Sequence, residues 1–287
     1  MARILVTGAT GNVGTAVIES LLMKSKQVAV SAGVRKAEML PADFAGKDVK
    51  VVAFDFLDQT TFPTAMDNAD ILFLLRPPAI SDVQSVFGPL IDSAVEDNIR
   101  HIIFLSVQGA EKNTMIPHNK IERLIVKSGI PYTFLRPAYF MQNFLTSLSH
   151  DLKVHSRIFL PAGQARFTLV DVRDIGSVTA EVVAELRLYT NQALVLTSND
   201  LLTFGEMADK LTLGLGRQIS YMSPSPFRFY RVKRAEGLPR MLVMVMIMLH
   251  FLPRFQTQPK VTDTVQKILK RKPIDFNQFI SDYQDRL

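Results

Sequence analysis

Short apolar runs alternate with helical patterns along the first two thirds of the chain, notably between Ser81 and Asn98. The runs that we interpret as strands are 3–7, 27–32, 49–55, 69–75, 101–107, 131–137 and 192–198. Apolar strands separated by helices indicate parallel pairing with both faces of the sheet covered. The pattern therefore predicts an α/β fold with a doubly wound parallel sheet, in which ligands bind at the carboxyl ends of the strands.

The pattern changes after Pro137. The segment from Ala138, AYFMQNFLTSL, is predicted to be helical, and RFTLVDVRDIGSVTAEVVAEL then predicts a short strand and a helix. Beyond Ser198 the chain is mostly helical, with proline breaks at 224 and 226. We therefore predict two domains, with a ligand cleft between them. The sheet domain is expected to comprise 1–137 plus 168–198, and the smaller, mostly helical lobe 138–167 plus 199–287.

Three glycines follow the first strand, in the sequence TGATGNVGT. Gly8, Gly11 and Gly14 remove side chains where the chain must turn sharply, approach a ligand with its backbone and pack a helix against the strand. That helix is predicted to begin near Asn12, so its free N–H groups and the positive end of its dipole point at the loop. A strand, a glycine loop and a helix in this order indicate a Rossmann-type dinucleotide site.

The residues after the second strand indicate which dinucleotide is preferred. Sites for NAD usually carry an acidic residue there, whereas Ser31, Ala32 and Gly33 are uncharged. Arg35 and Lys36 follow and would suit a 2′-phosphate, although both could be solvated loop residues. NADP(H) is therefore the expected cofactor. The residues predicted to contact it are Gly8, Thr10, Gly11, Asn12, Val13, Gly14, Arg35, Lys36, Asp55, Phe56, Leu75, Arg76, Ser106, Lys120 and Pro137.

Asp55 ends the third predicted strand and has two interpretations. Its carboxylate could accept a hydrogen bond from the adenine amino group of the cofactor. It could instead serve a turn or a helix N-cap within DFLD. The sequence alone does not separate these two roles.

The composition of the 287 residues, 47% apolar and 21% charged, is that of a globular protein. There is no cysteine, and the five histidines show no spacing typical of a metal site, so we expect neither a disulfide nor a metal. A strand at the start of the chain leaves no room for a leader, so a cytoplasmic location is expected. The apolar run Met241–Leu252 is too short for a transmembrane segment, since twelve helical residues extend only about 18 Å.

Residues 217–272 hold twelve Lys/Arg against Glu236 and Asp263. Such a run is either a solvated face or a surface that attracts an anionic partner. The methionine-rich run Met241–Leu252 could cover a pocket for varied apolar ligands. It could equally be packing core or the interface of a homodimer.

Several motifs together resemble one family. The glycine loop, GVRK, FLSVQGA, PHNKIERLIVKSGIPYTFLRPAYFMQNF and VDVRDIG occur in the order typical of the NmrA-like family of atypical short-chain dehydrogenase/reductases. The resemblance extends to about residue 200 and, more weakly, to the end. It implies a Rossmann domain with a small C-terminal lobe and binding of NADP(H). It also implies one of two activities, namely reduction of quinones, azo dyes or other electron-poor organics, or non-catalytic redox sensing through a regulatory protein.

Ordinary short-chain dehydrogenases combine a Ser after strand five with Tyr-x-x-x-Lys. Ser106 and Lys120 match the Ser and the Lys of that pattern, and Lys120 would add positive charge near the substrate. Ile116 stands where the Tyr is expected, so the usual phenol acid is missing. His118 and Tyr139 are the candidate replacements, although His118 could cap a helix and Tyr139 could be core.

The missing phenol favours hydride transfer to quinone-like acceptors, because solvent can protonate the hydroquinone anion that forms. We therefore expect an NADPH-dependent reductase of a small aromatic or quinone-like acceptor, with an NADP(H) sensor as the alternative. A third hypothesis is reduction of membrane quinones, with the basic region 217–272 resting on anionic lipid. Direct binding of nucleic acid is not expected.

Overall fold

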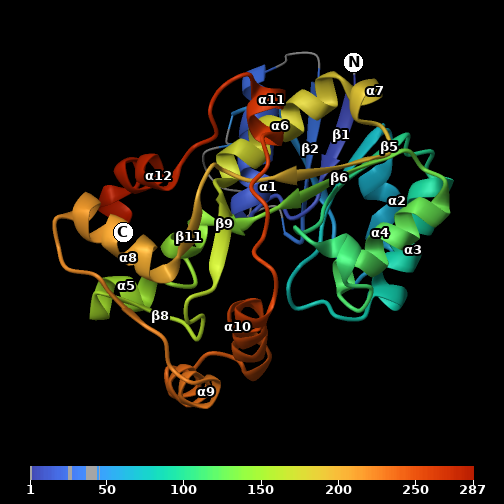
Figure 1. Cartoon of the computed structure of the whole chain (residues 1–287). Coiled ribbons are helices and arrows are strands. Elements are labelled where there is room, and N and C mark those ends of the chain that lie inside the picture. The colour runs from blue at the N-terminus through green and yellow to red at the C-terminus, as the bar shows by residue number, and fades with distance from the viewer. Residues whose placement is uncertain (1, 25–27, 37–43, 45) are drawn as a thin grey trace. The chain divides into compact units, whose positions relative to one another are not determined.

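The computed structural model describes residues 2–24, 28–36, 44 and 46–287 (Figure 1). Gln27, with which the second predicted strand begins, lies outside the described residues. The chain divides into two compact units. The first comprises 1–137, 172–196 and 264–271, and the second comprises 138–171, 197–263 and 272–287.

The first unit contains a parallel sheet of seven strands in the order β10-β6-β5-β4-β1-β2-β3. Its strands are β1 (Ala2–Val6), β2 (Val28–Val34), β3 (Val49–Ala53), β4 (Ile71–Leu75), β5 (His101–Leu105), β6 (Tyr132–Pro137) and β10 (Gln192–Leu196). The predicted doubly wound Rossmann-type fold is confirmed. The chain reverses direction in the sheet between β1 and β4, the place where such folds bind ligands.

Helices cover both faces of this sheet (Figure 1). They are α1 (Asn12–Lys24), α6 (Val172–Ala184) and α11 (Thr264–Leu269) on one side, and α2 (Thr61–Met66), α3 (Val83–Glu96) and α4 (Pro117–Ser128) on the other, with the short α7 (Leu186–Tyr189) leading into β10. α1 and α6 pack unusually closely, because a Cβ at Gly176 would lie 2.3 Å from the carbonyl oxygen of Ala16. On the opposite face, Phe87 and Ile121 pack on sheet residues such as Phe104.

The second unit has its own core, built around Phe144, Phe204 and Phe276. It contains two small sheets, β11-β9-β7 and β12-β8. Its strands are β7 (Tyr139–Phe140), β8 (Arg157–Phe159), β9 (Arg166–Val170), β11 (Leu201–Thr203) and β12 (Ser220–Met222). Its α-helices are α5 (Ser149–His155), α8 (Phe204–Leu215), α9 (Pro226–Ala235), α10 (Arg240–Phe251) and α12 (Phe276–Asp282).

Three segments, 168–171, 197–198 and 264–271, lie in the other unit from the domain predicted for them. β9 pairs with β7 and β11, so residues 168–171 belong to the second unit. α11 packs against α6 and β10, so 264–271 belong to the first. The helix predicted from Ala138 is wrong: β7 is extended because it pairs with β9, and a 3-10 helix, Met141–Leu145, follows.

Among the described helices, none combines the length and apolar character that a membrane crossing requires.

Candidate functional site

The glycine loop joins β1 to α1 and depends on two of its three glycines. Gly8 has φ +63°, a left-handed conformation that side chains disfavour. A Cβ at Gly14 would lie 2.2 Å from the carbonyl oxygen of Gly8 and 2.8 Å from the Cα of Ala9. Gly14 is therefore required for α1 to start so close to the end of β1. Gly11 is less constrained, since its Cβ would meet only the Gly8 oxygen at 3.4 Å.

The N-terminus of α1 lies directly after this loop. The Gly11 N–H donates to the Gly8 carbonyl at 3.0 Å, and the Thr15 N–H donates to the Gly11 carbonyl at 2.9 Å. The first N–H groups of a helix have no intrahelical acceptor, and the first turn of α1 carries no acidic residue. Thr10 and Asn12 are exposed beside them. This geometry suits a phosphate group.

Sequence analysis did not identify the role of Thr7. Its buried hydroxyl donates to the Phe73 carbonyl and accepts from the Leu75 N–H, both at 3.0 Å. These bonds tie the end of β1 to the end of β4, where the chain order of the sheet reverses. Leu75 covers the loop, with its Cδ2 3.0 Å from the position of a Cβ on Gly8. The sequence feature that could have indicated this role is the position of Thr7, a polar residue between an apolar strand and the first glycine of the loop.

Arg35 and Lys36 follow the end of β2 and are exposed. Within the described part of the chain, neither side chain forms an ion pair, so both guanidinium and ammonium face solvent. Asp55 makes a turn contact: its Oδ1 accepts from the Leu57 N–H at 3.0 Å. Phe56, which follows, is buried edge-to-face against Phe54 at 4.9 Å. The contacts of these residues with a cofactor stay predictions.

Two buried polar atoms near the ends of β4 and β5 lack a hydrogen-bond partner among the described residues. They are Nε of Arg76 and Oδ1 of Asn119. The other groups of these side chains are engaged, since Arg76 Nη1 donates to the Pro77 carbonyl at 3.2 Å and Asn119 Nδ2 donates to the Ala110 carbonyl at 3.0 Å. Buried polar groups are normally paired, so unpaired ones mark a place for a ligand or water. With the glycine loop, they fit a dinucleotide laid across the strand ends.

Ser106, after β5, belongs to a buried polar network. Its Oγ donates to Glu122 Oε1 at 2.6 Å, and Arg136 binds the same carboxylate through Nε at 3.0 Å and Nη2 at 2.7 Å. Arg136 also contacts Glu111 at 2.9 Å. The hydroxyl proton of Ser106 is therefore directed at Glu122. Sequence analysis missed Glu122, which lies in the NKIER motif four residues after His118. Pro137, at the end of β6, accepts from the Gln108 N–H at 2.9 Å.

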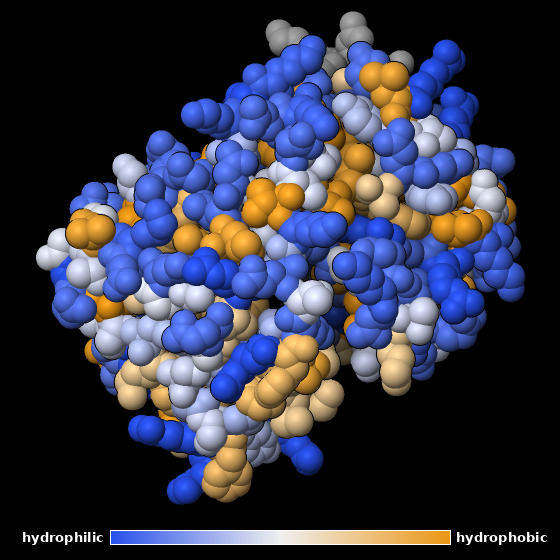
Figure 2. Space-filling view, viewed as in Figure 1, coloured by the Kyte–Doolittle hydropathy of each residue, from blue (hydrophilic) through white to orange (hydrophobic). Residues whose placement is uncertain are grey.

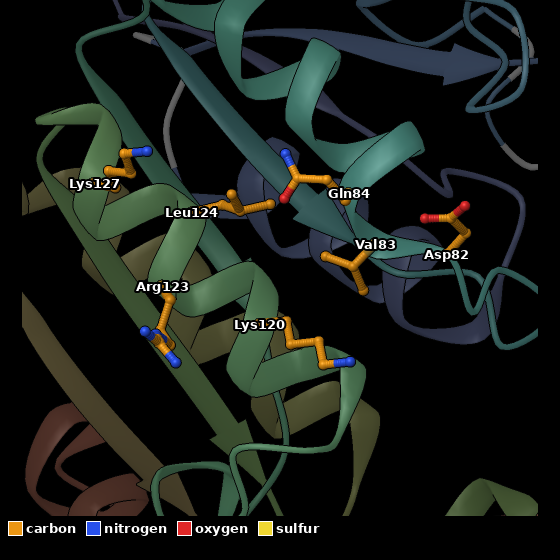
Figure 3. Close-up of a pocket in the computed structure, with 7 residues that line it drawn as sticks. All are labelled: Asp82, Val83, Gln84, Lys120, Arg123, Leu124 and Lys127. Carbon is orange, nitrogen blue, oxygen red and sulfur yellow. The ribbon is translucent and has the colours of Figure 1, made fainter.

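His118 and Lys120 lie on different sides of α4. His118 is half-buried, with its ring 6.2 Å from that of Phe104, and on a helix it shares a face with Glu122. Burial, assisted by the charge of Arg76, lowers the pKa of His118 to about 4. Lys120 is exposed and lines a pocket of about 570 Å³ (Figure 3). The catalytic role of Lys120 and its contact with the cofactor stay predictions.

Figure 3 shows how that pocket is built. Cationic and aliphatic side chains of α4 face the first residues of α3 across it. The lining residues are Asp82, Val83, Gln84, Lys120, Arg123, Leu124 and Lys127. Residues two apart on a helix point in nearly opposite directions, so the side of α4 that faces this pocket is not the side that carries Glu122.

Tyr139 lies in the second unit, at its β7 strand. Its ring packs against Phe167 and Phe204, with centroids 5.8 Å and 5.6 Å away, and its hydroxyl is 3.2 Å from Nε2 of His250. Nδ1 of His250 is 2.6 Å from the Met246 carbonyl, which can only accept, so Nδ1 carries the proton.

The protonation of this pair follows from its burial. Burial lowers the pKa of His250 to about 4, so the ring is neutral and Nε2 accepts the phenol proton of Tyr139. Burial also raises the pKa of the Tyr139 phenol. The hydroxyl is therefore a satisfied group of the second unit's core.

Comparison with known proteins places these features in one family. The model of the NmrA-like family matches residues 1–280. Prestalk A differentiation protein A of Dictyostelium discoideum is 27% identical over 97% of this chain and 91% of its own length. The NAD(P)H azoreductase of Xenophilus azovorans is 26% identical over 96% of both chains.

Solved structures share the fold over nearly the whole chain. The NADPH-dependent quinone oxidoreductase of Escherichia coli, complexed with NADPH, has a TM-score of 0.86 at 23% identity, covering 97% of this chain and 99% of its own. NmrA, a negative transcriptional regulator solved in complex with NADP, has a TM-score of 0.74 at 17% identity, covering 99% and 95%.

Proposed function

Because the chain belongs to the NmrA-like family, we propose that it is an NADPH-dependent reductase that transfers hydride to a quinone-like or other electron-poor organic acceptor. The observation that carries the proposal is the glycine loop after β1, in which Gly14 leaves no room for a Cβ. The neighbouring strand β2 is followed by Arg35, where sites for NAD usually carry an acidic residue. The names of relatives, an azoreductase and a quinone oxidoreductase, support the reaction class.

Binding of the cofactor is assigned to the strand ends of the first unit. The N–H groups at the start of α1 would hold the pyrophosphate, and the Arg35 guanidinium would pair with the 2′-phosphate. The unpaired atoms of Arg76 and Asn119 would hydrogen-bond the cofactor near the ends of β4 and β5. Asp55 accepts from the Leu57 N–H through Oδ1, and its second carboxylate oxygen would accept from the adenine amino group of the cofactor.

The reaction needs no protein acid. NADPH, when bound, supplies a hydride, and a quinone that receives it becomes a hydroquinone anion that water can protonate. The groups available as acids are poorly placed for that role. The Ser106 proton is directed at Glu122, and His118 with a pKa of about 4 is neutral at pH 7. A neutral His118 still offers one N–H, which would orient a carbonyl or a ribose hydroxyl.

A matched pair of substitutions on α4 tests this assignment. His118→Ala removes a donor from the side of Glu122, and Lys120→Ala removes a cation from the exposed side. We expect turnover to fall by about tenfold in the first variant, the value of one hydrogen bond, and to change little in the second. The opposite order would return the catalytic role to Lys120, as the Tyr-x-x-x-Lys resemblance implies.

The proposed activity is tested with purified protein, NADPH and a panel of quinones and azo dyes. Acceptor-dependent loss of NADPH absorbance supports it. NADPH binding without turnover on any acceptor contradicts it and favours the alternative, a sensor of the NADP(H) redox state that binds a regulatory protein. Two observations favour that alternative: the NmrA fold similarity, and the engagement of the Ser106 hydroxyl by Glu122.

The two functions also differ in affinity. A sensor would bind NADPH and NADP⁺ with comparable affinities, show no turnover and retain a protein partner during purification. A reductase releases NADP⁺ between turnovers. The cytoplasmic location and the homodimer stay predictions.

A further inference from the structure

The helix α10 of the second unit has two faces of opposite exposure. Val243, Met246 and His250 are buried and attach the helix to the core of that unit. The opposite face is also apolar, although it is exposed. Its large side chains recur every three or four residues and continue past the end of the helix: Met241, Met244, Met248, Leu252 and Phe255, flanked by Leu242 and Leu249. At the two ends of this stripe, Met241 is 70% exposed and Phe255 is 74% exposed.

Exposed arginines surround this apolar stripe. Arg228, Arg231 and Arg234 lie on α9, which packs beside α10. Arg240 begins α10, and Arg254 follows it with its guanidinium 5.1 Å from the Phe251 ring. Figure 2 shows orange and pale-orange side chains gathered where Figure 1 places α10, with blue side chains at the margin.

Acidic residues are nearly absent from this part of the chain. Between residues 224 and 260 the sequence has seven Lys/Arg and one acidic residue, Glu236. Glu236 is engaged by Lys233 at 2.8 Å. The stripe is therefore apolar at its centre and positive at its rim.

Ion pairs and a ring contact attach α9 to the rest of the second unit. Lys233 of α9 is buried and contacts both Asp151 and Glu236, and Arg157 binds Asp151 at 3.0 Å. The Phe229 ring stacks on Phe159 with centroids 5.8 Å apart. The exposed stripe is thus presented by two anchored helices.

We propose that the stripe on α10, with the arginines of α9 and α10, is a surface that binds an anionic lipid membrane. A helix with an apolar face and a basic rim lies in the interface, with its apolar side chains at the acyl boundary and its arginines at lipid phosphates. A helix of this length would extend only about 18 Å, so it lies on the membrane. The proposal does not rest on the proposed reductase function.

Charge decides between the candidate occupants. In a two-fold dimer the same surface meets itself, so the arginine rim of one copy would face that of the other. An anionic surface instead neutralises every arginine of the rim. The apolar stripe separately favours lipid over a purely ionic partner such as an acidic polypeptide, since only an apolar partner removes these side chains from water favourably.

The experiment is co-sedimentation of the full chain with phosphatidylcholine vesicles, with and without phosphatidylserine, at low and high salt. We expect sedimentation with the anionic vesicles at low salt, and weaker sedimentation at high salt because screening removes the attraction to the rim. The double variant Met244→Glu/Met248→Glu should lose at least about tenfold in vesicle affinity, since it places two negative charges in the apolar stripe.

The matched control is a double variant that also replaces two exposed apolar residues with glutamate, on helices outside the stripe. Met23→Glu/Leu213→Glu alters two exposed apolar residues of α1 and α8 and should lose much less affinity than the α10 variant. Circular dichroism checks that both variants are folded.

Four outcomes overturn the proposal. They are no sedimentation with anionic vesicles at low salt, an equal loss in both variants, capture by polyglutamate as strong as capture by vesicles, and a dimer in sedimentation velocity that Met244→Glu/Met248→Glu dissociates. The last would show that a second copy covers the stripe.

Discussion

Among the described residues, the buried polar atoms that lack a hydrogen-bond partner lie in the first unit, and the buried polar groups considered in the second are paired. At the strand ends of the first unit, Arg76 Nε and Asn119 Oδ1 have no partner among the described residues. In the core of the second unit, the Tyr139 hydroxyl is paired with His250, and Lys233 lies between Asp151 and Glu236. Both environments are buried, so an unpaired group would cost free energy in either.

This difference distinguishes buried polar groups that a bound ligand would pair from those that stabilise the fold through partners within their own unit. A polar group whose partners come from its own unit is satisfied before any ligand binds. A buried group without a partner gains stability only when a ligand supplies one. Substitutions in the two units test this contrast, with the free energy of unfolding measured for the second unit and cofactor affinity for the first.

The largest expected effect is the loss of a charge from the second unit's ion network. Asp151→Ala leaves Lys233 and Arg157 without their shared carboxylate. We expect the free energy of unfolding to fall by about 3 kcal/mol, because Arg157 loses its carboxylate and the buried Lys233 ammonium keeps only Glu236 as an ionic partner among the described residues. Urea unfolding followed by circular dichroism measures this. The affinity of the folded variant for NADPH should not change. A loss of NADPH affinity together with stability would contradict the proposed difference between the units.

Structure could be predicted from the sequence where a short stretch of residues is compatible with only one local conformation. The glycine loop between a strand and a helix, and the apolar strands separated by helices, led to the fold and to the end of the sheet that carries the candidate site. Gly14 illustrates the reason. The atoms that exclude a Cβ at Gly14 belong to residues only five or six positions earlier, so the requirement for glycine can be recognised from the local sequence.

Prediction was weaker where the partner comes from far along the chain. Tyr139 and Phe140 continue an apolar pattern that resembles a helix, but pairing with Leu169 and Val170 makes them a strand. The orientation of α4 was also missed: the bond from Ser106 to Glu122 shows which side of that helix faces the strand ends, and no spacing within NKIER reveals it. Contacts of this kind depend on tertiary packing.

The next effect concerns the glycine loop. Gly14→Val places carbon atoms where the Gly8 carbonyl oxygen stands, and should weaken NADPH binding by at least about 100-fold, or about 2.7 kcal/mol. Calorimetric titration measures the change. Gly205→Ala is the matched control near the start of another helix, α8, where a Cβ would meet nothing closer than 3.6 Å. Unchanged affinity in Gly14→Val would remove the loop from the site.

A smaller effect is expected for cofactor choice. Arg35→Ala should weaken NADPH binding by about tenfold and NADH binding little, because only NADPH carries the 2′-phosphate. Arg100→Ala is the control: Arg100 is exposed and pairs with Asp70, which precedes β4 at the amino end of that strand. Equal weakening of both cofactors by Arg35→Ala would contradict the assignment of the 2′-phosphate.

Tyr139→Phe tests a satisfied polar group directly. The substitution leaves Nε2 of His250 without its donor, so we expect a loss of about 1 kcal/mol in unfolding free energy. Turnover should change by less than about twofold, whereas loss of a general acid would cost about 100-fold or more. A large fall in turnover with little loss of stability would make Tyr139 the proton donor.

The smallest expected effect is that of pH on turnover near neutrality. Burial holds the pKa of His118 at about 4, below its ordinary value of 6.5, so the ring stays neutral as pH falls from about 8 to 5.5. If water protonates the product, turnover with a quinone should be flat across that range. An inflection near pH 6.5 that His118→Ala removes would show a proton moving through this histidine. The strand ends would then hold a working acid, and the contrast between the units would lie in catalysis as well as in binding.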